Sequence, residues 1–169
     1  IIALNSLEYL MTIRLIVGLG NPGPEYVQTR HNAGFWLVDH LADGQLRREA
    51  RFNALACKTF IAAQEVWLLE PQTFMNRSGE SVLAAASFHK ISPADIIVIH
   101  DELDLPFGTV RFKTGGGHAV RGQNGPITVP VGAMIEMAEG HPDALDLAAP
   151  EAPAALADAI ACPRAIACA

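Results

Sequence analysis

The hydrophobic pattern predicts strands alternating with helices over residues 13–113. Ile13–Gly18 is a short β-branched run, typical of a strand buried on both faces of a sheet. One helical face is then formed by Gly34, Leu37, Val38 and Leu41. A second apolar stripe predicts a helix over 78–90, with Ser78 able to cap its start. Further strands are predicted at 52–62, 66–69, 96–99 and 109–113. This alternation is typical of an α/β fold.

The pattern weakens after Gly125, where prolines interrupt the apolar stretches and leave a candidate helix over 152–161. All aromatic residues lie at or before Phe112, whereas residues 119–169 contain 15 alanines and 6 prolines. At the other end, the first methionine is Met11, directly ahead of the first predicted strand. We therefore expect one domain over 11–125, an upstream extension over 1–10 outside the fold, and an atypical Ala/Pro-rich acidic tail over 126–169.

Charge and cysteine content narrow the class of protein. The chain has 12 Lys+Arg and 18 Asp+Glu, a formal net charge of −6, and residues 119–169 contribute −4 of it. Acidity therefore does not argue against a nucleic-acid partner, although binding should be local and salt-sensitive. No apolar run approaches the roughly 18 residues of a membrane span. The three cysteines show no CxxC spacing, which disfavours a disulfide framework or zinc ribbon and favours the cytoplasm.

Polar residues follow two predicted strands, at the position where α/β sheets bind ligands. Asn21 follows the first strand, and Asp101 follows the strand at 96–99. Residues 18–23 match the dinucleotide pattern GxGxxG, but Pro22 and Pro24 remove backbone donors that pyrophosphate binding needs. The Asn-Pro-Gly-Pro turn instead predicts a rigidly held Asn21 amide that serves as a recognition group.

His31, at a helix start, is the candidate general base. A surface histidine is its ordinary interpretation, and a nearby Asp101 would favour catalysis by fixing the tautomer of the ring. The acidic run 101–104 has an alternative interpretation as a Mg²⁺ site, while the absence of HExxH disfavours a Zn²⁺ site. No GxSxG is present, and Cys57 has no histidine close in sequence. A histidine, a carboxylate and several asparagines suit acyl transfer to water.

Five segments, in this order and spacing, resemble the bacterial-type peptidyl-tRNA hydrolases. They are Leu15–Gly23 with Tyr26, Thr29–Gly34, Phe74–Gly79, His100–Pro106 and Gly115–His118. The resemblance covers about residues 11–119, and five motifs in register are far more specific than any one of them.

The resemblance implies a single three-layer α/β/α domain with a mixed, mostly parallel sheet. It implies hydrolysis of the ester between a peptide and the tRNA 3′ end, which recycles tRNA, by a cytoplasmic monomer without metal, cofactor or membrane partner. His31 would activate water, Asp101 would orient His31, and Asn21 would help to distinguish peptidyl-tRNA from free aminoacyl-tRNA. The positions corresponding to substrate contacts are Tyr26, Phe74, Asn76 and Asn124. Basic residues expected to meet tRNA phosphates are Arg30, Arg77, Arg111 and Lys113.

The sequence departs from the family pattern where its composition changes. Between His118 and Gly125 two residues are inserted, and Gln123 stands where the family has histidine, so the register of Asn124 is altered. A frame shift, a gene fusion or a truncated product would each explain the departure. The alternative function is therefore a catalytically impaired RNA-binding relative, or a truncated product of the same family.

Overall fold

The computed structural model describes residues 12–61, 63–102, 110–114, 120–122, 125–127 and 133–138. The strands of its main sheet are β1 (Leu15–Gly18), β2 (Arg47–Glu49), β3 (Ala54–Ile61), β4 (Gln64–Pro71), β5 (Ile96–Glu102), β6 (Val110–Thr114) and β9 (Ala133–Ala138). The α-helices in the described part of the chain are α2 (Ala33–Ala42) and α3 (Ser78–His89). Short 3-10 helices are η1 (Arg30–Asn32), η2 (Met75–Arg77) and η3 (Pro93–Asp95). β7 (Val120–Gly122) and β8 (Gly125–Ile127) form a separate pair.

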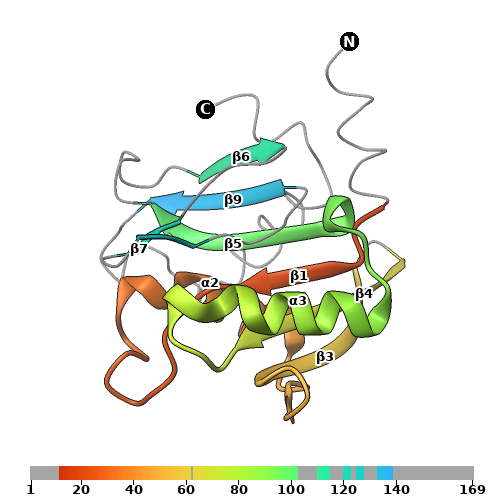
Figure 1. Cartoon of the computed structure of the whole chain (residues 1–169), viewed down its shortest axis with the longest axis horizontal. Coiled ribbons are helices and arrows are strands. Elements are labelled where there is room, and N and C mark those ends of the chain that lie inside the picture. The colour runs from red at the N-terminus through yellow and green to blue at the C-terminus, as the bar shows by residue number, and fades with distance from the viewer. Residues whose placement is uncertain are drawn as a thin grey trace.

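The main sheet is mixed, with the strand order β2-β3-β4-β1-β5-β9-β6. Its centre is parallel, because β1 pairs in parallel with β4 and β5, and β5 pairs in parallel with β9. The flanking strands β3 and β6 run antiparallel to their neighbours. Figure 1 shows these strands stacked from β6 to β3, with α3 crossing in front. The expected mixed sheet is confirmed, with its parallel pairings at the centre.

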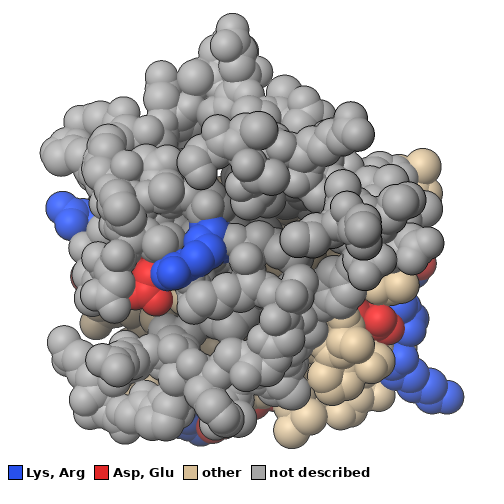
Figure 2. All heavy atoms as spheres, turned by 90° about the horizontal axis from the view of Figure 1, so that it is seen from above, with Lys and Arg blue, Asp and Glu red and all other residues tan. Residues whose placement is uncertain are grey.

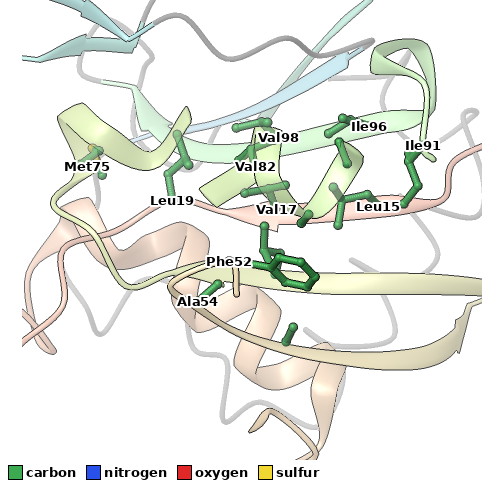
Figure 3. Packing of buried hydrophobic residues seen from close by; sticks show 14 residues of the cluster. Leu15, Val17, Leu19, Phe52, Ala54, Met75, Val82, Ile91, Ile96 and Val98 are labelled. Atoms are coloured by element: carbon green, nitrogen blue, oxygen red, sulfur yellow. The ribbon is translucent and has the colours of Figure 1, made fainter. Parts of the chain in front are cut away.

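Among the described residues, α2 covers one face of the sheet and α3 the other, which gives the expected three-layer α/β/α arrangement. Ile16, Leu68 and Ile97 pack with Leu37 and Val38 of α2 on one face. The opposite face packs against α3 and η2 through the residues shown in Figure 3, among them Leu15, Val17, Val82 and Val98. Successive residues of β1 therefore enter different cores, which explains its uninterrupted apolar sequence.

Helix α2 approaches the sheet so closely that its contact residue must be glycine. A Cβ atom on Gly34 would lie 2.4 Å from both the carbonyl oxygen of Ile99 and the amide nitrogen of Leu19. Gly18 faces the same contact, since a Cβ there would lie 2.2 Å from the carbonyl oxygen of Gly34. The start of α2 is therefore held against the carboxyl ends of β1 and β5.

The predicted elements at 13–18, 52–62, 66–69, 78–90 and 96–99 correspond to β1, β3, β4, α3 and β5, and the predicted 109–113 strand to β6. The prediction that Ser78 caps α3 is wrong: Arg77 occupies the cap position, and the buried Ser78 hydroxyl has no partner among the described residues.

Some predictions concern residues that the structure leaves out or describes only in part. Residues 1–10, 115–118 and 152–161, and Asn124 itself, lie outside the described residues. Within 126–169, β9 joins the main sheet between β5 and β6. Among the described helices, none is long and apolar enough to cross a bilayer.

Candidate active site

A histidine and an aspartate that are far apart in sequence meet at the carboxyl edge of the sheet. The Nδ1 atom of His31 lies 2.6 Å from Oδ2 of Asp101. His31 belongs to η1, immediately before α2, and Asp101 lies near the end of β5. The expected proximity of the two side chains is therefore present in the structure.

The fold explains this meeting. Ile97 and Ile99 of β5 face α2, and the two-residue period of a strand places Asp101 on the same face. Because Gly34 holds the start of α2 against Ile99, the preceding turn carries His31 to the level of Asp101. The geometry of the His31–Asp101 pair is thus set by backbone packing two to three residues away from each side chain.

The two side chains differ sharply in exposure. The Asp101 side chain is 5% exposed and that of His31 is 54% exposed. Burial raises the pKa of Asp101, and the neighbouring His31 opposes part of this rise by favouring the charged form. A carboxylate only accepts hydrogen bonds, so Nδ1 of a neutral His31 carries the hydrogen and Nε2 keeps its lone pair. This geometry leaves Nε2 as the ring atom of His31 that can accept a proton.

Asn21 lies beside this edge with its side chain in a fixed orientation. Its Oδ1 accepts a hydrogen bond of 2.8 Å from the backbone N–H of Met75, in η2. Its backbone is held by the side chain of Asn32, which accepts from Asn21 N–H at 2.8 Å and donates to Asn21 C=O at 3.0 Å. The rigid Asn21 predicted from the Asn-Pro-Gly-Pro turn thus gains its rigidity from two other segments.

Two aromatic side chains come together near the same loops. Tyr26 and Phe74 meet edge to face, with ring centroids 6.4 Å apart. Phe74 is 57% exposed although it is a large apolar residue, and Asn76 is also exposed in η2. Since Met75 of η2 bonds Asn21, the Phe74–Asn76 segment is fixed to the loop that carries Asn21.

The predicted phosphate-binding residues come from three different elements, η1, η2 and β6. Arg77 makes an exposed ion pair with Glu80, at 2.9 and 3.0 Å. Arg30 is exposed in η1 and Arg111 is exposed on β6, whereas the side chain of Lys113 lies outside the described part. On the face shown in Figure 2, the charged side chains of described residues lie in small groups, with basic beside acidic in two places.

No group of three or more metal-binding side chains occurs among the described residues.

One buried polar residue was missed as a site residue by the sequence analysis. Asn32 was noted only as part of the segment Thr29–Gly34, and nothing in the sequence links it to Asn21 eleven positions earlier. Its position directly after His31 is the single sequence signal that could have pointed to it.

A buried carboxylate hydrogen-bonded to an exposed histidine, at the carboxyl edge of an α/β sheet, is an arrangement that can support general-base chemistry. The family model described as peptidyl-tRNA hydrolase matches residues 15–129. The chain belongs to the peptidyl-tRNA hydrolase family.

Solved structures agree with this assignment. A peptidyl-tRNA hydrolase from Acinetobacter baumannii is 41% identical with a TM-score of 0.68, and the match covers 88% of this chain and 83% of that one. A point mutant of the A. baumannii enzyme has the same identity and coverage and a TM-score of 0.69. A peptidyl-tRNA hydrolase in complex with N-propanol also matches at 41% identity, with the same coverage and a TM-score of 0.68.

Proposed function

We propose that this chain hydrolyses the ester between a peptide and the 3′ end of tRNA, with His31 as the general base. The observation that carries the proposal is the 2.6 Å contact between Nδ1 of His31 and Oδ2 of the buried Asp101. The contact leaves Nε2 of an exposed imidazole as the basic atom. Membership in the peptidyl-tRNA hydrolase family supplies the substrate class.

The chemistry follows from this arrangement. Nε2 of His31 takes a proton from water while the water oxygen attacks the ester carbonyl carbon. The bond from that carbon to the ribose oxygen then breaks, and the leaving ribose oxygen receives the proton from the imidazolium. Asp101 stabilises the imidazolium and keeps Nδ1 protonated. A positioned base of this kind contributes about 10²–10⁴-fold to the rate.

Asparagine amides would supply the neutral donors that the reaction needs. An N–H aimed at the carbonyl oxygen stabilises the charge that develops there during attack. Asn21 and Asn76 lie on segments joined through Met75, and Asn32 ties Asn21 to the turn that carries His31. We assign them, with Asn124, to binding the peptide carbonyl groups. Tyr26 and Phe74 would supply the apolar surface for the substrate.

Phosphate contacts are assigned to Arg30, Arg77, Arg111 and Lys113. Arg77 would have to exchange its ion pair with Glu80 for a phosphate, which costs little for exposed side chains. Because the chain is acidic overall, the association should be local and should weaken as salt increases. We propose that the protein meets its tRNA substrate in the cytoplasm and acts there as a monomer.

A second candidate function is RNA binding without turnover. The altered segment around Gln123 and Asn124 favours it, since a substrate-binding asparagine of the family would be out of register there. The intact His31–Asp101 contact favours the enzyme.

One experiment separates the two. Binding of tRNA and hydrolysis of N-acetyl-aminoacyl-tRNA are measured on the same sample, with and without EDTA, and free aminoacyl-tRNA serves as the control substrate. The enzyme proposal predicts hydrolysis of the N-acetylated substrate alone, unchanged by EDTA. Binding without hydrolysis would support the second function, and hydrolysis that EDTA abolishes would contradict the mechanism.

A further inference from the structure

The side chain of Asn32 is buried, and both of its hydrogen bonds are made to one residue. It is 3% exposed, accepts from the backbone N–H of Asn21 and donates to the backbone C=O of the same residue. A planar amide that bonds both groups fixes the position and the plane of the Asn21 backbone, much as a neighbouring strand would.

This use of Asn32 differs from the usual role of an asparagine at its position. Asn32 is the residue directly before α2, where asparagine commonly caps the helix through its side chain. Here the side chain makes no cap hydrogen bond, and the first turn of α2 contains no acidic residue. The start of α2 therefore lacks a side-chain cap hydrogen bond, because the Asn32 amide bonds Asn21 instead.

The chain leaves room for this contact at Gly20. A Cβ atom there would lie 2.9 Å from Oδ1 of Asn32 and 2.8 Å from the ring of Phe35. The residue before Asn21 thus has to be glycine for Asn32 to reach the backbone.

The consequence concerns the side chain of Asn21. Its Oδ1 is bonded to Met75 N–H, so the amide plane is fixed and Nδ2 is the group left to act. Among the residues that the structure describes, none is seen to accept a hydrogen bond from that Nδ2. With the backbone held by Asn32 and the oxygen by Met75, Asn21 presents a donor in a set direction.

We propose that Asn32 is a positioning residue for the reaction, which acts by holding Asn21 so that its Nδ2 donates to a carbonyl oxygen of the substrate. The inference rests on the proposed function. Two consecutive residues of one turn would then serve the site. His31 is the base that contacts Asp101, and Asn32 holds Asn21, the donor.

The test is a double-mutant cycle in hydrolysis of N-acetyl-aminoacyl-tRNA. We expect Asn32→Ala to lower kcat/KM by about 10–100-fold, because a small misplacement of a substrate-contacting group has effects of this size. In an Asn21→Ala background, the same change should alter kcat/KM by less than about 2-fold, since the group that Asn32 positions is gone. The acid limb of the pH–rate profile should not move.

Asn32→Asp is the second variant, and it replaces Asn32→Ala in the cycle if the alanine variant does not fold. The aspartate keeps an acceptor for the N–H of Asn21 but places an oxygen against the carbonyl oxygen of Asn21. We therefore expect kcat/KM to fall about as much as in Asn32→Ala. Ser81→Ala is the matched control. Ser81 is buried and also donates a side-chain hydrogen bond to a backbone carbonyl, that of Asn53 at 3.2 Å, and its loss should leave kcat/KM unchanged.

The inference would be overturned if kcat/KM of the Asn32 variants stayed within about 2-fold of wild type. It would also be overturned if kcat/KM fell equally in the presence and absence of the Asn21 side chain. A shifted acid limb of the pH–rate profile would overturn it as well, because it would mean that Asn32 acts through His31. Failure of the proposed function itself would be seen separately, as an absence of hydrolysis by the wild-type protein or, for the role of His31, as full activity of His31→Ala in the same assay.

Discussion

The imidazole of His31 and the carboxyl group of Asp101 lie 2.6 Å apart although 70 positions separate them in the chain. Their contact depends on Gly34, whose missing side chain lets α2 touch the backbone of β5 at Ile99. Core packing at Gly34 therefore sets the geometry of the site, so a change at this contact should affect both the stability and the activity of the protein.

Replacing Asp101 with asparagine tests what the charge of this carboxylate contributes to the basicity and the tautomer of His31. The asparagine side chain would keep the size of the aspartate but lose the charge that stabilises the imidazolium and selects the Nδ1–H tautomer. We expect kcat/KM to fall at least about 10-fold, with the acid limb of the pH–rate profile moved to lower pH. Asp95→Asn, which removes a carboxylate just before the opposite end of β5, is the control and should change neither. An unshifted profile in Asp101→Asn would contradict the assigned role.

Gly34→Ala tests the link between packing and catalysis. The new methyl group would meet backbone atoms of Ile99 and Leu19 at 2.4 Å, so α2 has to move away from the sheet. We expect a loss of about 1–3 kcal/mol in the free energy of unfolding, as for other overpacked cores, together with a fall in kcat. Thermal unfolding and the hydrolysis assay on one sample measure both.

Gly44→Ala is the matched comparison for that variant. Gly44 has φ +71° with no atom within 4 Å of a Cβ, so alanine meets only the backbone cost of the left-handed region, about 1 kcal/mol. Activity should be unchanged. Equal losses of activity in both variants would show that reduced stability alone explains the effect of Gly34→Ala.

A buried acid outside the site predicts how stability depends on pH. Glu70 is buried on β4, and burial, followed by the charge of Asp39 and a hydrogen bond to it, raises its pKa from 4.5 to about 8. The folded state thus holds a proton that the unfolded state releases between these values. Because the folded state binds more protons, the contribution of Glu70 to stability is full below about pH 4.5 and is lost as pH rises toward 8.

Glu70→Gln should remove that loss. We expect the variant to be more stable than wild type at pH 8 by about 1–3 kcal/mol, the usual cost of a buried polar group without compensation, and no more stable at pH 4.5. Glu65→Gln changes an exposed glutamate of the same strand, one that pairs with Lys58, and should leave the pH dependence as it is. Parallel stability curves for Glu70→Gln and wild type across this range would contradict the prediction.

The exposed ring of Phe74 should contribute to substrate binding and little to stability. Covering it with substrate is worth about 1–2 kcal/mol, so Phe74→Ala should lower kcat/KM about 5–30-fold while the melting temperature stays close to wild type. Phe60 is also exposed, at 71%, but lies on β3 away from the site. Phe60→Ala should therefore leave kcat/KM unchanged, and equal losses would argue against a substrate contact at Phe74.

Periodicity and turn chemistry were sufficient to predict most of the fold. β1 and β5 are visible as apolar runs because residues on both of their faces are buried, and α2 is visible because one of its faces is. β9 was not predicted, since Ala133–Ala138 has no β-branched run and has Glu136 within it. It forms a strand by pairing with β5 and β6, which is tertiary information.

The site was predictable in its residue types but not in its distances. His31 and Asp101 were identified from motifs, whereas their separation depends on the approach of Gly34 to Ile99. Beyond its position next to His31, nothing in the sequence points to Asn32, because it bonds the backbone of Asn21 and such a contact does not depend on the type of the partner residue.

The most direct test of the account is the hydrolysis of N-acetyl-aminoacyl-tRNA by His31→Ala. His40→Ala is the matched control, since His40 is an exposed histidine in the last turn of the neighbouring helix α2. We predict that kcat/KM falls about 10²–10⁴-fold for His31→Ala and stays within about 2-fold of wild type for His40→Ala, with both variants folded. Full activity of folded His31→Ala would contradict the assignment of His31 as the general base.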